Sequence, residues 1–249
     1  MIRLPLLDEY ALDRFPDPHT ALAEPNGLLA FGGDLSPERL KIAYAHGIFP
    51  WFNEGEPILW WSPDPRCVFY TETLRPNRSL RRAVAGKGWQ VTVDRAFRQV
   101  MEACAAPRPS QAGTWISPAM IDAYDELHAQ GYAHSVEVWE GGWLIGGVYG
   151  VSIGKLFCGE SMFSAQSGGS KLALCALAAL LRRWGFPLID AQVSNPHLLG
   201  LGAVEMPRSA FLRSITTLVT APFDPKHWND LPILAATRLL EDDPFMDSA

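Results

Sequence analysis

Cysteine and long apolar runs are both scarce in this sequence of 249 residues. The four cysteines form no CxxC pair, and none has a histidine at metal-ligand spacing, which argues against a disulfide framework or a zinc site. The six histidines are equally dispersed. No apolar run approaches the roughly 20 residues of a membrane-spanning helix, and the acids Asp8 and Glu9 follow Pro5 too early for a signal peptide. We therefore expect a cytoplasmic protein without a metal site.

Basic residues are also in the minority, with 21 Lys and Arg against 27 Asp and Glu, a net charge of -6. That balance argues against a nucleic-acid partner, because phosphate binding depends on Lys and Arg. The distribution argues the other way. Between Arg75 and Arg98 lie seven basic residues and a single acid, Asp94, so this stretch carries +6 and the remainder -12. The stretch is either a local site for a polyanion or a solvated helix face.

The first third of the chain is rich in Gly, Pro and Trp. Within it, Ser36 can cap a short helix, Pro37 suits the first helical position, and Gly47 suits the exit. One short helix with loops rarely forms a core alone, so residues 1–64 are predicted to be a small α/β domain packed on a larger one. The run from Ser62 to Pro65 is the expected joint, and residues 65–249 form the second domain.

Beyond residue 65, hydrophobic periodicity predicts a definite order of elements. A strand over 89–93 precedes a helix that Asp94 caps and that runs to about 105, and Ser117 and Pro118 open a second helix that Gly131 ends. The later predictions are strands at 135–140 and 143–148 joined by a two-glycine turn, a strand at 156–163, a helix at 171–184, a strand at 188–193, helices at 207–219 and 231–240, and an acidic tail at 241–244. The order is typical of an α+β domain.

Two of the predicted strands carry polar residues among apolar neighbours. Alternation places Glu160 on the face of Leu156, Cys158 and Met162, and it places Asp190 and Gln192 together on one face of the later strand. Because a buried unpaired charge is costly, these groups need partners or a function. If the two strands are neighbours that splay apart, all three side chains line one cleft; they could equally form an internal polar network that ties the strands together.

Six motifs in order carry a resemblance to a known family. They are Gly32–Leu35, Gly47–Phe52, Trp60–Arg66, Gly113–Ile116, Phe157–Phe163 and Leu188–Gln192. Together they resemble the bacterial leucyl/phenylalanyl-tRNA-protein transferases, and the match continues more weakly to about Leu212. The element order from 89 to 219 is similar to that of the GNAT acyltransferases, in which two central strands splay apart to admit the acyl donor. The resemblance implies a small N-terminal domain packed on a GNAT-like domain with a splayed mixed sheet.

The resemblance also implies an activity and its residues. The family transfers Leu or Phe, less readily Met, from aminoacyl-tRNA to proteins with an N-terminal Arg or Lys, marking them for N-end-rule degradation. Trp51 and Trp115 match aromatics that contact the terminal adenosine, and Asn195 is assigned to substrate binding with them. The positions that match an apolar side-chain pocket are Val148, Phe157, Met162, Leu174, Leu177, Leu181 and Ile189. From the basic stretch we separately expect the tRNA contacts at Arg78, Arg81, Arg82 and Lys87, and we expect the protein to be a monomer.

This transfer reaction requires few catalytic groups. An aminoacyl ester is already activated, so amide formation requires positioning and a neutral amine rather than a nucleophilic side chain or a cofactor. We expect Asp190 and Gln192 to relay a proton from the amine while Glu160 orients the amine or the ester. Strict alternation separates Phe157 from Met162, so a bulge or splay has to bring the pocket residues onto one face.

Two other functions fit part of the pattern. A GNAT N-acetyltransferase would bind acetyl-CoA through a glycine-rich loop, and Gln166–Lys171 approaches that motif except at Lys171, where a small residue is needed. A non-catalytic tRNA-binding module would use the basic stretch and exposed tryptophans without turnover. Transfer from either leucyl-tRNA or acetyl-CoA to a peptide beginning with Arg distinguishes the three.

Overall fold

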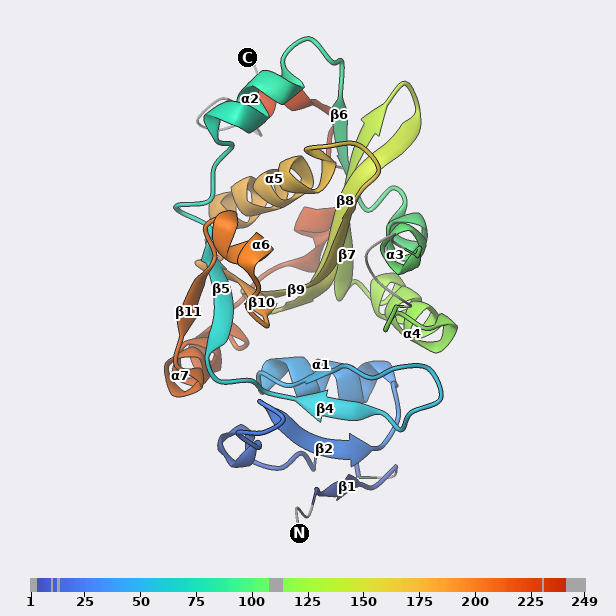
Figure 1. The fold of residues 1–249 in the computed structure, drawn as a ribbon, viewed down its shortest axis with the longest axis vertical. Coiled ribbons are helices and arrows are strands. Elements are labelled where there is room, and N and C mark those ends of the chain that lie inside the picture. Colours follow the sequence, from blue (N-terminus) through green and yellow to red (C-terminus); the bar gives the residue numbers. More distant parts are fainter. Residues whose placement is uncertain (1–3, 10, 13, 108–113, 230, 241–249) are drawn as a thin grey trace.

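The computed structural model describes residues 4–9, 11–12, 14–107, 114–229 and 231–240, and it contains two sheets (Figure 1). The smaller one has the order β1-β2-β4-β3. Its strands are β1 (Leu6–Leu7), β2 (Leu28–Gly32), β3 (Phe49–Pro50) and β4 (Leu59–Trp61). Helix α1 (Pro37–Ala45) begins where the Ser36 side chain accepts a hydrogen bond from the Arg39 N–H, as the sequence predicted.

The larger sheet has eight strands in the order β11-β5-β10-β9-β8-β7-β6-β12. Their bounds are β5 (Arg66–Tyr70), β6 (Gln90–Val93), β7 (Ala133–Glu140), β8 (Trp143–Ile153), β9 (Leu156–Ser164), β10 (Leu188–Gln192), β11 (Val204–Met206) and β12 (Leu234–Ala235). The turn between β7 and β8 is Gly141–Gly142, both at positive φ, so the predicted primed hairpin is confirmed. Strands β9 and β10 are parallel neighbours, as a GNAT-like order requires.

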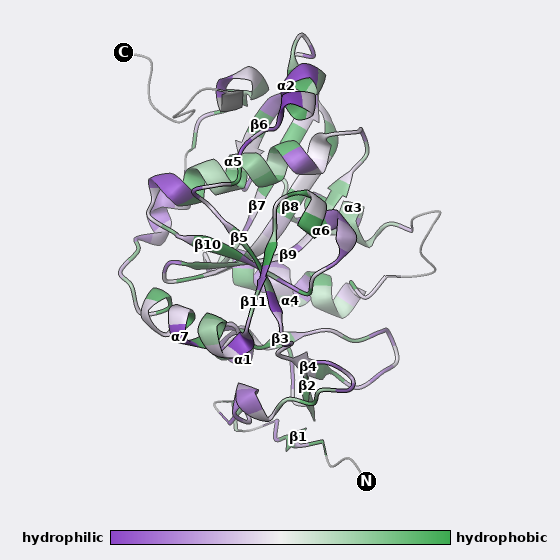
Figure 2. Ribbon diagram, turned by 60° about the vertical axis from the view of Figure 1, so that its left-hand side comes forward, coloured by the Kyte–Doolittle hydropathy of each residue, from purple (hydrophilic) through white to green (hydrophobic). Residues whose placement is uncertain are grey.

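Helices cover both faces of the larger sheet. The helices that follow the small sheet along the chain are α2 (Arg78–Val84), α3 (Phe97–Ala105), α4 (Pro118–Ala129), α5 (Gly169–Arg183), α6 (Pro196–Gly200) and α7 (Arg208–Leu218). The 3₁₀ turns are η1 (Pro18–Thr20) in the N-terminal part, and η2 (Pro225–Trp228) and η3 (Ala236–Leu240) near the end of the described chain. Helix α5 lies on one face and α3 and α4 on the other (Figure 1). Figure 2 shows α5 largely hydrophobic and α2 largely hydrophilic. None of the described helices is long and apolar enough to cross a membrane.

Two apolar clusters fill the space between these layers. One joins α5 to the strand residues on its face, including Phe157 and Ile189. The other lies on the opposite face and runs from Leu29 and Trp60 in the small sheet to Tyr149 and Phe211 in the large domain. A continuous core therefore joins the two parts of the chain, and the division near residue 64 stays a prediction.

Two predictions of local structure were wrong. Asp94 does not cap α3, whose N-cap is Ala96; instead its carboxylate accepts a hydrogen bond from the Ser135 N–H across the sheet (2.8 Å). Residues 231–240 do not form one helix, because Leu234 and Ala235 pair with β6 and only the following residues turn into a 3₁₀ helix. The predicted acidic tail at 241–244 and Gly113 of the fourth motif lie outside the described residues.

Two irregularities in β9 and β10 shape the centre of the sheet. The register of β8 with β9 shifts between Tyr149↔Ser161 and Gly150↔Gly159, leaving Glu160 as the extra residue of a β-bulge. A Cβ at Gly150 would lie 2.1 Å from the Cys158 carbonyl oxygen, so the bulge requires glycine there. The bulge reverses the alternation, so Phe157 and Met162 belong to one apolar cluster, as the expected bulge requires.

Candidate active site

Three cavities meet at Glu160 and Leu198, beyond the point where β9 and β10 stop pairing at Cys158 and Asp190. The apolar cavity, of about 80 Å³, is lined by Phe69, Val148, Gly159, Glu160, Ser161, Met162, Leu174, Ile189, Ala191 and Leu198. The aromatic cavity, of about 290 Å³, is lined by Phe49, Pro50, Trp51, Trp115, Glu160, Ala191, Gln192, Val193, Ser194, Asn195 and Leu198. The polar cavity, of about 500 Å³, is lined by Glu160, Ser161, Met162, Ser164, Ser167, Gly168, Ser170, Lys171, Asn195, His197 and Leu198.

Glu160 is a partly buried carboxylate at this junction. Its Oε1 accepts a hydrogen bond from the Gln192 amide (2.7 Å), and its Oε2 accepts one from the Tyr124 hydroxyl (3.3 Å). Burial raises the pKa of Glu160 to about 7, the hydrogen bonds from Tyr44 and Gln192 oppose part of that rise, and the negative charge of Asp190 adds to it. The carboxylate can therefore both hold and release a proton near neutral pH.

Two buried tyrosines hydrogen-bond to Glu160. Tyr44 lies on α1 in the N-terminal part of the chain, and Tyr124 lies on α4. Their hydroxyl groups hydrogen-bond to each other. Burial, together with the charge of Glu160, raises the pKa of both tyrosines well above the usual value, so both remain protonated donors. The N-terminal part of the chain thus contributes directly to the environment of Glu160.

Asp190 lies in the same region but faces away from the cavities. It is fully buried, and Arg66 holds both of its oxygens, with Nε 2.7 Å from Oδ1 and Nη2 2.6 Å from Oδ2. The sequence left two interpretations open for Glu160, Asp190 and Gln192, and each describes part of the arrangement: Glu160 and Gln192 line the aromatic cavity, whereas Asp190 belongs to an internal polar network with Arg66. The physical reason is the β-bulge at the end of β10, which places Ala191 and Gln192 at the cavity while Asp190 turns into the core.

Gln192 connects these two acids. Its side-chain amide donates to Glu160, and its backbone N–H donates to Asp190 Oδ1 (3.0 Å). Its φ of 61° is in the left-handed region, where a residue other than glycine is held only by its surroundings. The Arg66–Asp190 pair supplies that support, so the buried ion pair fixes the position from which Gln192 reaches the cavity.

The assigned substrate-binding residues fall into three groups. Val148, Met162, Leu174 and Ile189 line the apolar cavity. Trp51, Trp115 and Asn195 line the aromatic cavity. Phe157, Leu177 and Leu181 are fully buried in the same apolar cluster but lie behind the cavity wall rather than on its surface.

Several lining residues were not assigned to the site from the sequence. Phe69 was not assigned to any strand, Ala191 is the middle residue of the bulge, and Leu198 belongs to the five-residue helix α6. Arg66 and Tyr44 stand next to or within recognisable motifs, but nothing in their spacing indicated that each would reach an acid more than 100 residues away.

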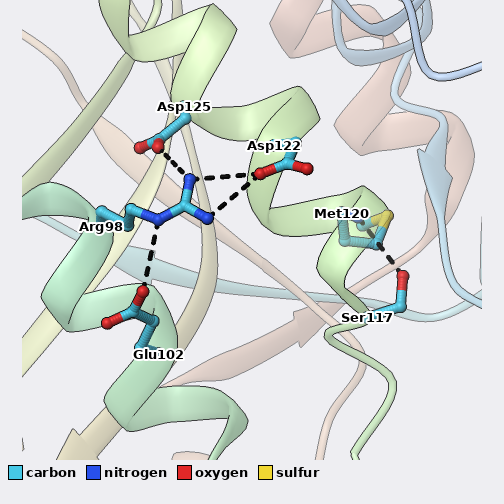
Figure 3. Close-up of polar contacts among 6 residues, drawn as sticks. All are labelled: Arg98, Glu102, Ser117, Met120, Asp122 and Asp125. Carbon is cyan, nitrogen blue, oxygen red and sulfur yellow. Dashed lines mark hydrogen bonds and ion pairs between the residues drawn. The ribbon is translucent and has the colours of Figure 1, made fainter.

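The basic stretch divides in the folded chain. Arg78, Arg81 and Arg82 are exposed on α2, and Lys87 follows in the next loop with its Nζ 4.9 Å from the centre of the Trp89 ring. Figure 3 shows that Arg98 lies elsewhere, between α3 and α4. Its guanidinium contacts Asp125 (2.5 Å), Asp122 (3.2 Å) and Glu102 (3.3 Å), so acids neutralise it and it adds little to the field of α2.

The fold also gathers three groups that the sequence separates. Ligand atoms of Asp94, His128 and His134 lie within 4.8 Å of one another. The short contacts join His134 Nδ1 to Asp94 Oδ2 (2.7 Å) and His128 Nδ1 to the Ala133 carbonyl oxygen (2.7 Å). Both Nδ1 atoms are thus used in hydrogen bonds, which makes the cluster a link between β6, α4 and β7.

Comparisons of the sequence with known proteins match it to a family. The leucyl/phenylalanyl-tRNA protein transferase family model matches residues 68–216, and the model of the family's N-terminal domain matches residues 33–64. A distant structural likeness is a GCN5-related N-acetyltransferase from Sphaerobacter thermophilus, with 16% identity and a TM-score of 0.36 over 76% of this chain and 60% of that one.

The curated relatives share one name, and their sequences align with this chain over most of their length. Leucyl/phenylalanyl-tRNA--protein transferases from Xanthomonas euvesicatoria and Xanthomonas axonopodis are 57% and 56% identical, over 86% and 90% of this chain and the same shares of their own. The enzyme of that name from Shewanella denitrificans is 57% identical over 83% of this chain and 88% of its own. Identity at this level across both matched regions shows that the chain belongs to the leucyl/phenylalanyl-tRNA-protein transferase family.

Proposed function

We propose that this protein transfers leucine or phenylalanine, less readily methionine, from aminoacyl-tRNA to the N-terminal Arg or Lys of acceptor proteins. The observation that supports it most is Glu160, with a pKa of about 7, at the junction of an apolar cavity and a cavity lined by Trp51 and Trp115. The apolar cavity suits the amino-acid side chain, and the two tryptophans suit the terminal adenosine. We place this reaction in the cytoplasm and assign it to a monomer.

In the proposed reaction, the amine lone pair of the acceptor attacks the ester carbonyl carbon of the aminoacyl-tRNA. As the C–N bond forms, the Glu160 carboxylate accepts the amine proton, and the ester C–O bond breaks with a proton returning to the ribose oxygen. Gln192 orients the groups through its amide. Because Asp190 reaches the site through the Gln192 backbone N–H, we assign it a positioning role in place of direct proton transfer.

The first test is transfer itself. Purified protein incubated with radiolabelled leucyl-tRNA and a peptide beginning with Arg is expected to place the label on the peptide. The same peptide with an acetylated N-terminus should remain unlabelled, because it offers no free amine. Labelling from acetyl-CoA instead, or tRNA binding without any transfer, would support one of the two alternative functions and contradict this one.

The tRNA is proposed to lie along α2, where Arg78, Arg81, Arg82 and the nearby Lys87 present positive charge. Figure 2 shows this helix, coloured largely as hydrophilic, above α5. The α2 side chain of Leu80 lies against Gly168, which lines the polar cavity beside Lys171. This contact shows that α2 lies close to the polar cavity, so a tRNA bound along α2 would need to extend its single-stranded end only a short way to reach Glu160.

Replacing Arg78, Arg81 and Arg82 together by glutamine is expected to weaken tRNA binding by at least ~10-fold near physiological salt and to flatten its salt dependence. Each lost phosphate contact should lower the slope of log K against log salt by about 0.7–0.9. Fluorescence titration at several salt concentrations measures both quantities. Arg98→Gln is the matched control, since acids already neutralise that arginine, and equal effects of the two variants would argue against the footprint.

A further inference from the structure

Glu205 occupies the row of the sheet that also carries Gln192. It is exposed on β11, where it pairs with Cys67 of β5, and Gln192 pairs with the same Cys67 from the other side. Residues in register on neighbouring strands point to the same face of a sheet. Cys67 belongs to the cluster on the face that bears the apolar cavity, so Glu205 projects on the cavity side. With strands roughly 4.8 Å apart, Glu205 lies about 10 Å from Gln192.

The carboxylate of Glu205 is held at the rim of the aromatic cavity. The hydroxyl of Ser194, a lining residue, donates a hydrogen bond to its Oε1. In the described part of the chain no Lys, Arg or His forms an ion pair with Glu205. An acid that is fixed in position, exposed and lacks a cation is suited to receive one from a ligand.

The other two acids near the cavities, Asp190 and Glu160, are not available to bind the cation of a ligand. Arg66 neutralises Asp190 in the core, and Glu160 has to accept the proton of the attacking amine, which it cannot do while it pairs with a cation. The span from the Glu160–Gln192 junction to Glu205 corresponds to an extended arginine or lysine side chain with a hydrogen bond at each end. β11 is also the edge strand of the sheet, so the rest of an acceptor chain can leave into solvent beyond it.

We infer that Glu205 forms the subsite for the cationic side chain of the acceptor's N-terminal residue, with Ser194 holding the carboxylate toward the cavity. The inference rests on the proposed transfer reaction and names the group that selects Arg and Lys at the acceptor N-terminus. The amine then lies at Glu160 and Gln192 while the guanidinium or ammonium lies at Glu205.

The test is steady-state transfer of leucine from leucyl-tRNA to peptides that differ only in their first residue, Arg or Gln. Glu205→Gln is expected to raise KM for the Arg peptide by roughly 3- to 10-fold, with kcat and KM for leucyl-tRNA unchanged, because an exposed charge pair contributes modestly. The preference for the Arg over the Gln peptide should narrow by the same factor. A merely structural role would lower transfer to both peptides equally and would leave that ratio intact.

Reversing the charge at position 205 gives a stronger test of the proposed subsite. Glu205→Lys should lower transfer to the Arg peptide further and should improve transfer to a peptide beginning with Glu. Two controls use other exposed acids, Glu126→Gln on α4 and Glu54→Gln in the loop that follows Trp51, and neither should change the Arg-to-Gln ratio. An unchanged ratio in Glu205→Gln, or a change in Glu54→Gln instead, would overturn the subsite; a wild-type protein that transfers nothing would overturn the proposed function and this inference with it.

Discussion

Arg66→Met is expected to lower the free energy of unfolding by about 3–5 kcal/mol, because it leaves the buried carboxylate of Asp190 without its cation. Both side chains are almost completely buried, and Arg66 also donates to the Gly47 carbonyl oxygen (3.0 Å) of the N-terminal part. Urea unfolding followed by tryptophan fluorescence measures the loss. Transfer activity should fall at the same time, since Asp190 would no longer hold the backbone of Gln192.

Arg39→Met is the matched control for this effect. Arg39 is equally buried, but the side chain of its partner Asp34 is 35% exposed, so water can solvate the remaining carboxylate and the loss should be smaller. The double variant Arg66→Met with Asp190→Asn should recover part of the stability that Arg66→Met loses, because it removes the unpaired charge. Strictly additive losses would mean that the pair contributes as two independent residues.

The regular elements were the most predictable part of the fold. Caps such as Ser36 and Ser117 lie next to prolines that suit the first helical turn, and each accepts the expected backbone hydrogen bond; Figure 3 shows that of Ser117 with Met120. The Gly141–Gly142 turn was equally plain. These signals are local, so the sequence around each residue is sufficient to determine the outcome.

Long-range contacts could not be predicted in the same way. Asp94 is a residue type that often caps helices, but its carboxylate instead accepts a hydrogen bond from the Ser135 N–H across the sheet and contacts His134 Nδ1, while Ala96 is the N-cap of α3. The sequence pattern also placed Asp190 in the cleft, since alternation assumes a regular strand and the bulge before Gln192 breaks it. Within the candidate site, the sequence identified the acids but not the groups that control them.

Those controlling groups come from distant parts of the chain. Arg66 is the first residue of β5 and forms the ion pair with Asp190. Tyr44 lies on helix α1 in the N-terminal part and hydrogen-bonds to Glu160. Tyr44 was given no role from the sequence, and a pattern of hydrophobic positions does not show which polar atom a tyrosine hydroxyl reaches. Which atom the hydroxyl reaches depends on how the N-terminal part packs against the larger sheet, and that packing exists only in the folded molecule.

Glu160→Gln is expected to lower the rate of transfer by about 100- to 10,000-fold, the range in which a positioned general base contributes. The loss should fall on kcat, with KM for leucyl-tRNA changing little, because the amide keeps the volume of the side chain. In the wild-type protein, transfer at saturating substrate should rise with pH through about 7, since only the carboxylate form of Glu160 can accept a proton. Glu160→Gln should lose that rise and keep only the titration of the acceptor amine, whose reference pKa is roughly 7.7–8.0.

Tyr44→Phe separates a proton-accepting role of Glu160 from a purely steric one. Its hydrogen bond lowers the pKa of Glu160, so removing the hydroxyl should move the midpoint of the wild-type rise to higher pH while transfer at high pH is largely retained. Tyr70→Phe, at the exposed end of β5, should leave the midpoint where it is. Single-turnover rates measured from pH 5.5 to 9 provide the comparison. If Tyr44→Phe leaves the midpoint unchanged, the titration does not belong to Glu160, and the proton must leave the amine by another route.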